Sequence, residues 1–192
     1  MVVGEEKEEY LRVISDKAHR LKEFVISLFE WVKLDAKEQV FHFELSDLNE
    51  LTRSIIADWV PTLENSRLEY EIEIPENEWS ARIDANAFTR ILNNLFQNIM
   101  VHSAATYIKL SVKEDTQRAI ISLTDNGKGI STEDLPHIFE RMYQCDHSRS
   151  ANGNGLGLSI TKELVNAHKG TISAASSPGL GTTFTIVLPK AL

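Results

Sequence analysis

A glycine-rich turn that runs directly into a helix is the feature that most constrains the fold of this chain. Glycine stands at every second position from Gly153 to Gly157, and Ile160, Leu164 and Ala167 follow at the spacing of one helix face. Exposed backbone N–H groups at such a turn, together with the helix dipole, form a site for an anion such as phosphate. A flexible surface loop can have the same glycine content, so the turn alone leaves both interpretations open.

The composition narrows the class of partner. Of the 192 residues, 42% are hydrophobic, which is enough for one full core and a smaller element, and the net charge is −8. This charge argues against nucleic acid and an anionic membrane as partners, and no apolar run approaches the ~20 residues of a membrane span. The single Cys145 excludes an internal disulfide and fits a reducing compartment. We expect a cytoplasmic chain without membrane contact of its own, although its parent could be anchored in the cell membrane.

Residues 5 to about 36 are predicted to form one long helix. Apolar or small side chains recur at alternating steps of three and four, as in a heptad seam. The seam residues are Leu11, Ile14, Ala18, Leu21, Val25, Leu28 and Val32. Such a helix cannot bury its own apolar face, so it packs either against the following domain or against a helix of a second copy. The regularity of the seam favours the second interpretation.

The rest of the chain is predicted to alternate between helices and strands. Asp47 should cap a helix that runs to about Ser66 and is bent or ended by Pro61, and Asp84 should cap one that runs to about Met100. Strand patterns lie at 67–74, 80–83, 107–113, 118–124, 171–176 and 182–188, with a strand-like connector at 40–45 and a last helix at 156–168 that Gly170 should end. Polar and apolar residues alternate strictly at 67–74, so this strand is expected to have one buried and one solvent-exposed face. This order predicts an α/β two-layer sandwich, a mixed and mostly antiparallel sheet with helices on one face, preceded by the long N-terminal helix.

Two groups of polar residues stand out from this pattern. Asn94 and Asn98 lie one helical turn apart, so their amides point the same way, although a solvated helix face would look the same. Asp125 ends a strand and is followed by Gly127 and Gly129. A carboxylate on a tight turn can accept a hydrogen bond from the exocyclic amine of a purine, and glycines let the backbone approach a flat ring. An amide oxygen can serve as a ligand of Mg²⁺.

Five short boxes carry a resemblance to a known family. They are Asn-Leu-Phe-Gln-Asn at 94–98, Asp-Asn-Gly-Lys-Gly at 125–129, Phe-Glu-Arg-Met-Tyr at 139–143, Gly-Asn-Gly-Leu-Gly-Leu at 153–158 and Gly-Leu-Gly-Thr-Thr-Phe at 179–184. In this order they resemble the N box, first glycine box, F box, and second and third glycine boxes of the ATP-binding catalytic domain of two-component sensor histidine kinases, in the Bergerat-fold ATPase superfamily.

The resemblance also implies a division into domains. Residues 5–36 resemble the second helix of the family's dimerisation domain. We therefore expect a partial dimerisation helix at 1–40 and an ATP-binding catalytic domain at 41–192. The ATP lid would lie at about 131–155, with Phe139 hinging it onto the core.

By this resemblance the site binds ATP and Mg²⁺. On the base side, Asp125 would accept a hydrogen bond from the adenine amine, Gly129 and Ile130 would shape the ring pocket, and Thr183 would close its back. On the phosphate side, Asn98 would bind Mg²⁺ and Asn94 would line the phosphates. Backbone N–H groups would be presented to the phosphates by Gly153, Gly155, Leu156 and Gly157. The boxes and their flanks also assign His102, Gly127 and Tyr143 to the nucleotide site.

Three features depart from the family pattern. No histidine of the chain has the His-Glu-x-x-x-Pro context of the phosphoacceptor, so no catalytic residue is assigned. Val101 stands where the family usually has a phosphate-contacting lysine, and Gln144 where many members carry an arginine. Phosphoryl transfer relies on positioning and charge neutralisation, so the loss of two cations predicts slow chemistry. Arg141, Arg149 and Lys128 are candidates for compensating phosphate contacts.

The resemblance implies an ATP-dependent protein-histidine kinase. It would transfer the γ-phosphate of ATP to a histidine outside this chain, form a homodimer through the N-terminal helix of its parent and serve the receiver domain of a response regulator. One alternative is a degenerate module that dimerises and holds nucleotide weakly or not at all, which Val101 and Gln144 support. Another is a different Bergerat ATPase, such as a topoisomerase, chaperone or anti-sigma-factor kinase, which the F box, the short lid and the heptad helix disfavour.

Overall fold

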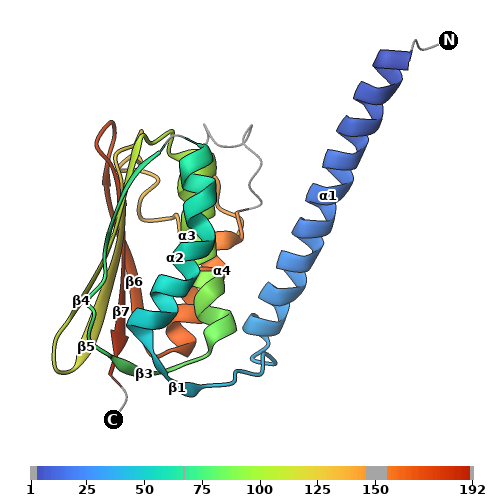
Figure 1. Cartoon of the computed structure of the whole chain (residues 1–192). Coiled ribbons are helices and arrows are strands. Elements are labelled where there is room, and N and C mark those ends of the chain that lie inside the picture. The colour runs from blue at the N-terminus through green and yellow to red at the C-terminus, as the bar shows by residue number, and fades with distance from the viewer. Residues whose placement is uncertain (1–3, 67, 146–154, 191–192) are drawn as a thin grey trace. The chain divides into compact units, whose positions relative to one another are not determined.

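The structure is a computed structural model that describes residues 4–66, 68–145 and 155–190 (Figure 1). The chain divides into two compact units, Met1–Gln39 and Val40–Leu192. Within the described residues, no helix combines the length and the apolar character that crossing a membrane requires.

The first unit consists of one helix, α1 (Gly4–Asp35), which confirms the predicted long helix. The large apolar side chains of its heptad seam are exposed, from 36% for Leu28 to 63% for Leu21. Exposed apolar area of this extent is unfavourable in water, so a seam of this kind favours burial against another surface.

The second unit is built on a five-stranded sheet with the strand order β2-β4-β5-β7-β6. The strands are β2 (Glu69–Glu73), β4 (Tyr107–Glu114), β5 (Arg118–Asp125), β7 (Gly181–Pro189) and β6 (Thr171–Ser177). β2 is parallel to β4, and the other neighbours are antiparallel. A separate antiparallel pair joins β1 (Glu44–Asp47) and β3 (Ser80–Ile83).

Three helices cover one face of this sheet (Figure 1). They are α2 (Leu48–Asn65), α3 (Ala85–His102) and α4 (Gly157–Ala167). Every second side chain of β4, β5 and β7 points to this face, as the strand period requires, and meets the apolar stripe of α3. The buried sheet residues include Ile108, Leu110, Ile121, Leu123, Phe184 and Ile186, and those of α3 include Phe88, Ile91, Leu92, Leu95 and Phe96, each at most 1% exposed. The predicted two-layer sandwich is confirmed.

Two local expectations were wrong. The strand predicted at 67–74 was expected to bury one face, but β2 lies at the edge of the sheet, and Tyr70 and Ile72 remain 37% and 38% exposed. Gly170 was expected to end α4, but the left-handed residue is Lys169, with φ 59°. Glycine is needed at 170 for space, since a Cβ there would lie 2.5 Å from the carbonyl oxygen of Val187.

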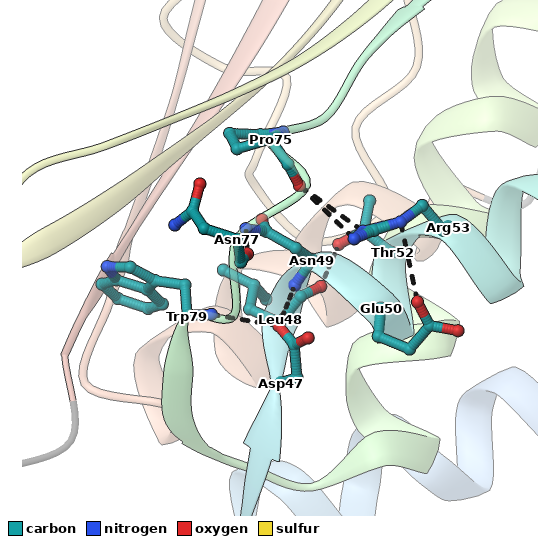
Figure 2. A network of polar contacts seen from close by, with 9 residues as sticks. All are labelled: Asp47, Leu48, Asn49, Glu50, Thr52, Arg53, Pro75, Asn77 and Trp79. Carbon is teal, nitrogen blue, oxygen red and sulfur yellow. Dashed lines mark hydrogen bonds and ion pairs between the residues drawn. The ribbon is translucent and has the colours of Figure 1, made fainter.

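The start of α2 is fixed by polar contacts to the loop before β3 (Figure 2). As predicted, Asp47 caps the helix, and its Oδ1 accepts hydrogen bonds from the N–H groups of Asn49 at 3.0 Å and Trp79 at 3.1 Å. The Asn49 amide donates to the carbonyl of Asn77 at 2.8 Å, and the Arg53 guanidinium lies 3.4 Å from the carbonyl of Pro75. These bonds satisfy backbone groups that a helix end and a loop would otherwise leave unpaired.

Asp84 performs a similar task at the start of α3, with an additional link to the segment before β1. Its carboxylate accepts the N–H groups of Ala87 at 2.9 Å and His42 at 2.8 Å, while its own N–H donates to Nε2 of the buried His168 at 3.2 Å. Burial alone would raise the pKa of Asp84, but these backbone hydrogen bonds outweigh it and hold the pKa below its usual value.

We predict that Asp84→Ala lowers the free energy of unfolding by about 2 kcal/mol at pH 7, because two backbone donors lose their acceptor. Urea denaturation measures this, with Asp58→Ala, an exposed position on α2, as a control expected to change stability by less than about 0.5 kcal/mol. The Asp84 contribution is fully present above the unfolded-state pKa of about 3.9 and is lost as the pH falls through the lower folded-state pKa. The unfolding free energies of the wild type and of Asp84→Ala should therefore converge below about pH 4. A difference between them that does not change with pH would contradict this account.

Candidate functional site

Asp125, the last residue of β5, is the most buried charged group of the predicted site. It is 2% exposed, and among the described residues no cation forms an ion pair with it. Its Oδ1 accepts the N–H of Gly127 at 2.7 Å, and the backbone N–H of Thr182 also bonds to the carboxylate. Burial raises the pKa of Asp125 and these two bonds oppose that effect. A carboxylate has about four lone-pair positions, and only two N–H donors bond to this one, so it can still accept a hydrogen bond from a ligand.

Glycines around Asp125 are required by backbone contacts. A Cβ on Gly127 would overlap the carbonyl oxygen of Ser103, the residue that caps the end of α3. A Cβ on Gly129 would overlap the carbonyl oxygen of Ser177, and both Gly129 and Gly181 have positive φ values, +69° and +85°. The first and third glycine boxes therefore touch through their main chains, next to the end of α3.

Thr182, rather than the predicted Thr183, lies on the same face of the sheet as Asp125. The two residues are directly opposite each other in the β5–β7 register, and Thr182 is 6% exposed. The hydroxyl of Thr183 lies 3.0 Å from that of Thr124, and both residues alternate to the other face. The strand period, counted back from the buried Phe184, would have identified Thr182 from the sequence.

Asn94 joins α3 to the first turn of α4. Its amide nitrogen lies 3.2 Å from the carbonyl oxygen of Gly157 and 3.2 Å from Oγ1 of Thr161. The Thr161 hydroxyl itself donates to the Gly157 carbonyl at 2.8 Å. The amide group of Asn94 therefore donates its hydrogen bonds to α4. In this structure Asn94 holds the two helices in register.

Asn98 and His102 follow Asn94 at one-turn intervals on α3. Both are partly exposed. Among the described residues, the Asn98 amide has no hydrogen-bond partner, and Nδ1 of His102 is buried without one. Burial lowers the pKa of His102, and the positive charge of Lys128 lowers it further, which favours the neutral ring. Asn98 and His102 therefore carry hydrogen-bonding groups that no described residue uses.

Among the described residues, no side chain caps the N-terminus of α4 with a hydrogen bond. Leu156 occupies the cap position with its side chain buried, and the first turn contains no acidic residue. Gly157 has open space around it, whereas Gly155, with φ +68°, packs against the main chain of Met142. The first N–H groups of a helix have no acceptor within the helix, so this turn is a candidate site for an anion. The predicted Gly153 and Arg149 lie outside the described residues.

The F box is held by internal contacts of the segment that precedes the undescribed residues. The Tyr143 hydroxyl donates to Oδ1 of Asp134 at 2.7 Å, and Oδ2 of the same carboxylate accepts the Ser131 hydroxyl at 2.7 Å. The Phe139 ring meets the core residue Phe184 edge-on, with ring centroids 6.5 Å apart. Arg141 has an exposed side chain. Asp134 was not among the predicted site residues, although its spacing of three from Ser131 is that of a local capping pair.

We predict that Gly181→Ala destabilises the chain by at least about 2 kcal/mol more than Gly179→Ala does. Both substitutions place alanine at a positive φ, but only the Cβ at 181 would overlap the main chain of Asp125, while 179 has open space. Urea denaturation of the two variants separates the two costs. Equal losses would show that backbone strain alone, and not the contact with Asp125, requires glycine at 181.

Comparison with known proteins agrees with this geometry. The family described as histidine kinase-, DNA gyrase B-, and HSP90-like ATPase matches residues 83–192. The sensor histidine kinase YcbM of Bacillus subtilis is 32% identical over 189 residues, which cover 97% of this chain and 61% of YcbM. The chain thus spans less than two thirds of the length of this relative.

Solved structures show the same fold. Full-length ShkA in complex with AMPPNP is 22% identical, with a TM-score of 0.83 over 97% of this chain and 39% of ShkA. Histidine kinase ThkA in complex with the response regulator protein TrrA is also 22% identical, with a TM-score of 0.77 over 100% of this chain and 53% of ThkA. The predicted resemblance to histidine kinase catalytic domains is confirmed, and the chain belongs to the family of histidine kinase-, DNA gyrase B- and HSP90-like ATPases.

Proposed function

We propose that this chain is the Mg-ATP-binding catalytic part of a sensor histidine kinase that phosphorylates a histidine outside these residues. The observation that carries the proposal is Asp125, a buried carboxylate that forms no ion pair with a cation of the described residues and that can accept further hydrogen bonds. The family to which the chain belongs consists of ATPases, and ShkA, which shares the fold, is seen with the ATP analogue AMPPNP.

On the base side, the carboxylate of Asp125 accepts a hydrogen bond from the adenine amine. A buried anion makes a strong, charge-assisted acceptor, and a ligand donor lowers the cost of its burial. Thr182 and Gly127 hold the carboxylate through their backbone N–H groups. Gly129 and Ile130 shape the wall of the ring pocket, because the glycine turn brings the main chain close.

On the phosphate side, the uncapped first turn of α4 and the Asn98 amide are the groups that face the triphosphate. Mg²⁺ keeps most of its water ligands and accepts few protein oxygens, so the carbonyl oxygen of Asn98 is a sufficient protein ligand. This agrees with the absence, within the described residues, of any cluster of three or more His, Cys, Asp or Glu side chains that could hold a metal. A bound Mg²⁺ neutralises charge on the phosphates.

The reaction moves the γ-phosphoryl group of ATP to an imidazole nitrogen. The new N–P bond forms as the bond between the γ-phosphorus and the β,γ-bridging oxygen breaks, ADP leaves, and the imidazole proton passes to solvent. This chain positions the nucleotide, and the acceptor histidine comes from elsewhere in the full-length protein. The phosphohistidine then serves the receiver domain of a response regulator, as the ThkA–TrrA complex suggests by analogy.

We expect calorimetric titration of the chain with ATP to show micromolar binding that Mg²⁺ strengthens. Asp125→Asn should abolish detectable binding while leaving the fold intact, because an amide donor replaces one acceptor in a buried pocket at a cost of about 1–3 kcal/mol or more. Asp58→Asn, an exposed carboxylate on α2, is the matched control and should bind as the wild type does.

Each part of the assignment has its own contradicting result. Unchanged affinity in Asp125→Asn would rule out the adenine contact, and equal affinity with and without Mg²⁺ would rule out the Asn98 assignment. If the wild type does not bind ATP at concentrations up to millimolar, valine at 101 and glutamine at 144 leave the site too weak to hold the nucleotide, and the chain is a degenerate module.

The proposed domain division places the dimerisation element in residues 1–40 and the catalytic domain, with its lid at about 131–155, in 41–192. The division of the structure at Gln39 supports the first boundary. The exposed heptad seam of α1 supports a homodimer, because a second α1 offers a face of matching period.

We predict that the sedimentation mass of the chain rises with concentration towards that of a dimer. Leu21→Glu places a charge in the seam and should keep the chain monomeric, whereas Lys22→Glu, which lies next to the seam, should not. A monomer mass at every concentration for the wild type would refute dimerisation through α1.

A further inference from the structure

The hydroxyl of Ser176, on β6, uses all of its hydrogen-bonding capacity on the turns beside Asp125. It donates to the carbonyl oxygen of Gly181 at 2.7 Å and accepts the N–H of Ile130 at 2.8 Å. The Thr182 hydroxyl lies 2.9 Å away. Because the single Ser176 proton goes to the Gly181 carbonyl, which can only accept, Thr182 is the donor of this third bond.

These three bonds connect two segments that are far apart in the sequence. Ile130 follows the first glycine box, while Gly181 and Thr182 belong to the third. The same segments are also joined by the bond from the Gly179 N–H to the Lys128 carbonyl at 2.7 Å. The Ser176 hydroxyl therefore ties the residue that follows the first box to two residues of the third box.

Ser176 acts on Asp125 through Thr182. The Thr182 hydroxyl donates to Ser176, and the Thr182 backbone N–H bonds to the Asp125 carboxylate. Ser176 also holds the Ile130 backbone, which lies at the far end of the turn that begins at Asp125. Removal of the hydroxyl would leave the Ile130 N–H without an acceptor and would release the turns on both sides of the carboxylate.

We propose that Ser176 is a positioning residue for base selection, whose hydroxyl fixes the Asp125 carboxylate and the Ile130 turn so that the site distinguishes a 6-amino purine from a 6-oxo purine. The proposal rests on the proposed contact between Asp125 and adenine. A carboxylate rejects a 6-oxo group only while it is held against that group, since a site that can relax admits water between the two acceptors.

The test is the ratio of the dissociation constants of inosine triphosphate and ATP, measured by calorimetry on the 192-residue chain with Mg²⁺. Ser176→Ala should lower this ratio about tenfold, through weaker ATP binding with little change for inosine triphosphate. Ser173→Ala makes the same change at an exposed position of the same strand and should leave the ratio within about twofold of the wild type. Ser176→Thr keeps the hydroxyl and should largely restore the ratio.

A variant with a generally damaged site should bind both nucleotides more weakly, whereas a variant that has lost base selection should change the ratio of the two dissociation constants. If Ser176→Ala weakens both nucleotides equally, or behaves like Ser173→Ala, the inference is overturned. If Ser176→Ala does not fold, Thr182→Val removes one hydroxyl of the same network at nearly constant shape, and an unchanged ratio in that variant overturns the inference as well.

The experiment also separates this inference from the proposed function. If the wild type does not bind ATP, or if Asp125→Asn binds ATP as well as the wild type, the adenine contact fails and the role of Ser176 fails with it. If Asp125→Asn loses ATP binding while Ser176→Ala keeps the full ratio, the adenine contact stands and only the role of Ser176 is overturned.

Discussion

The burial of one carboxylate, Asp125, sets the requirements for the rest of the site. Removing an ion from water costs several kcal/mol unless donors replace the lost hydration. Here the donors are backbone N–H groups of Gly127 and Thr182 rather than a cationic side chain. Backbone groups reach the carboxylate only where main chains come into contact, and this explains why glycines stand at 127, 129 and 181.

The two asparagines of α3 illustrate how similar residues on one helix face acquire different tasks. The amide of Asn94 is occupied by Gly157 and Thr161, so it fixes the distance between α3 and the first turn of α4. Asn98, one turn later, forms no hydrogen bond with a described residue. The rigid contact at Asn94 therefore sets where Asn98 stands relative to the N–H groups of α4, and binding groups on two helices act together only when such a contact exists.

Most of the fold could be predicted from local patterns, because each element carries its own period and cap. Asp47 and Asp84 mark the starts of α2 and α3, and the alternation of 107–113 and 118–124 gives β4 and β5.

The predictions that failed concern which segments contact one another, and not which helices and strands form. β2 alternates like a half-buried strand, but its place at the edge depends on the whole sheet. The bonds from His168 to Asp84 and from Ser176 to Ile130 join residues distant in sequence, and no local period encodes them. Thr183 was chosen from a box, whereas the pleat determines which of two adjacent threonines faces Asp125.

The exposed edge strand β2 also bears on how the chain avoids aggregation. Its unpaired edge could add a strand from another molecule, but Glu69, Glu71 and Glu73 place a row of carboxylates along it. Lys109 of the neighbouring β4 lies 2.9 Å from Glu71 and 2.8 Å from Glu73, and hydrogen bonding to this lysine lowers the pKa of Glu71 to about 2. The hydrogen bonds to Lys109 therefore favour the charged form of Glu71, and an ion-paired, carboxylate-rich edge is a poorer template for an added strand than an apolar edge would be.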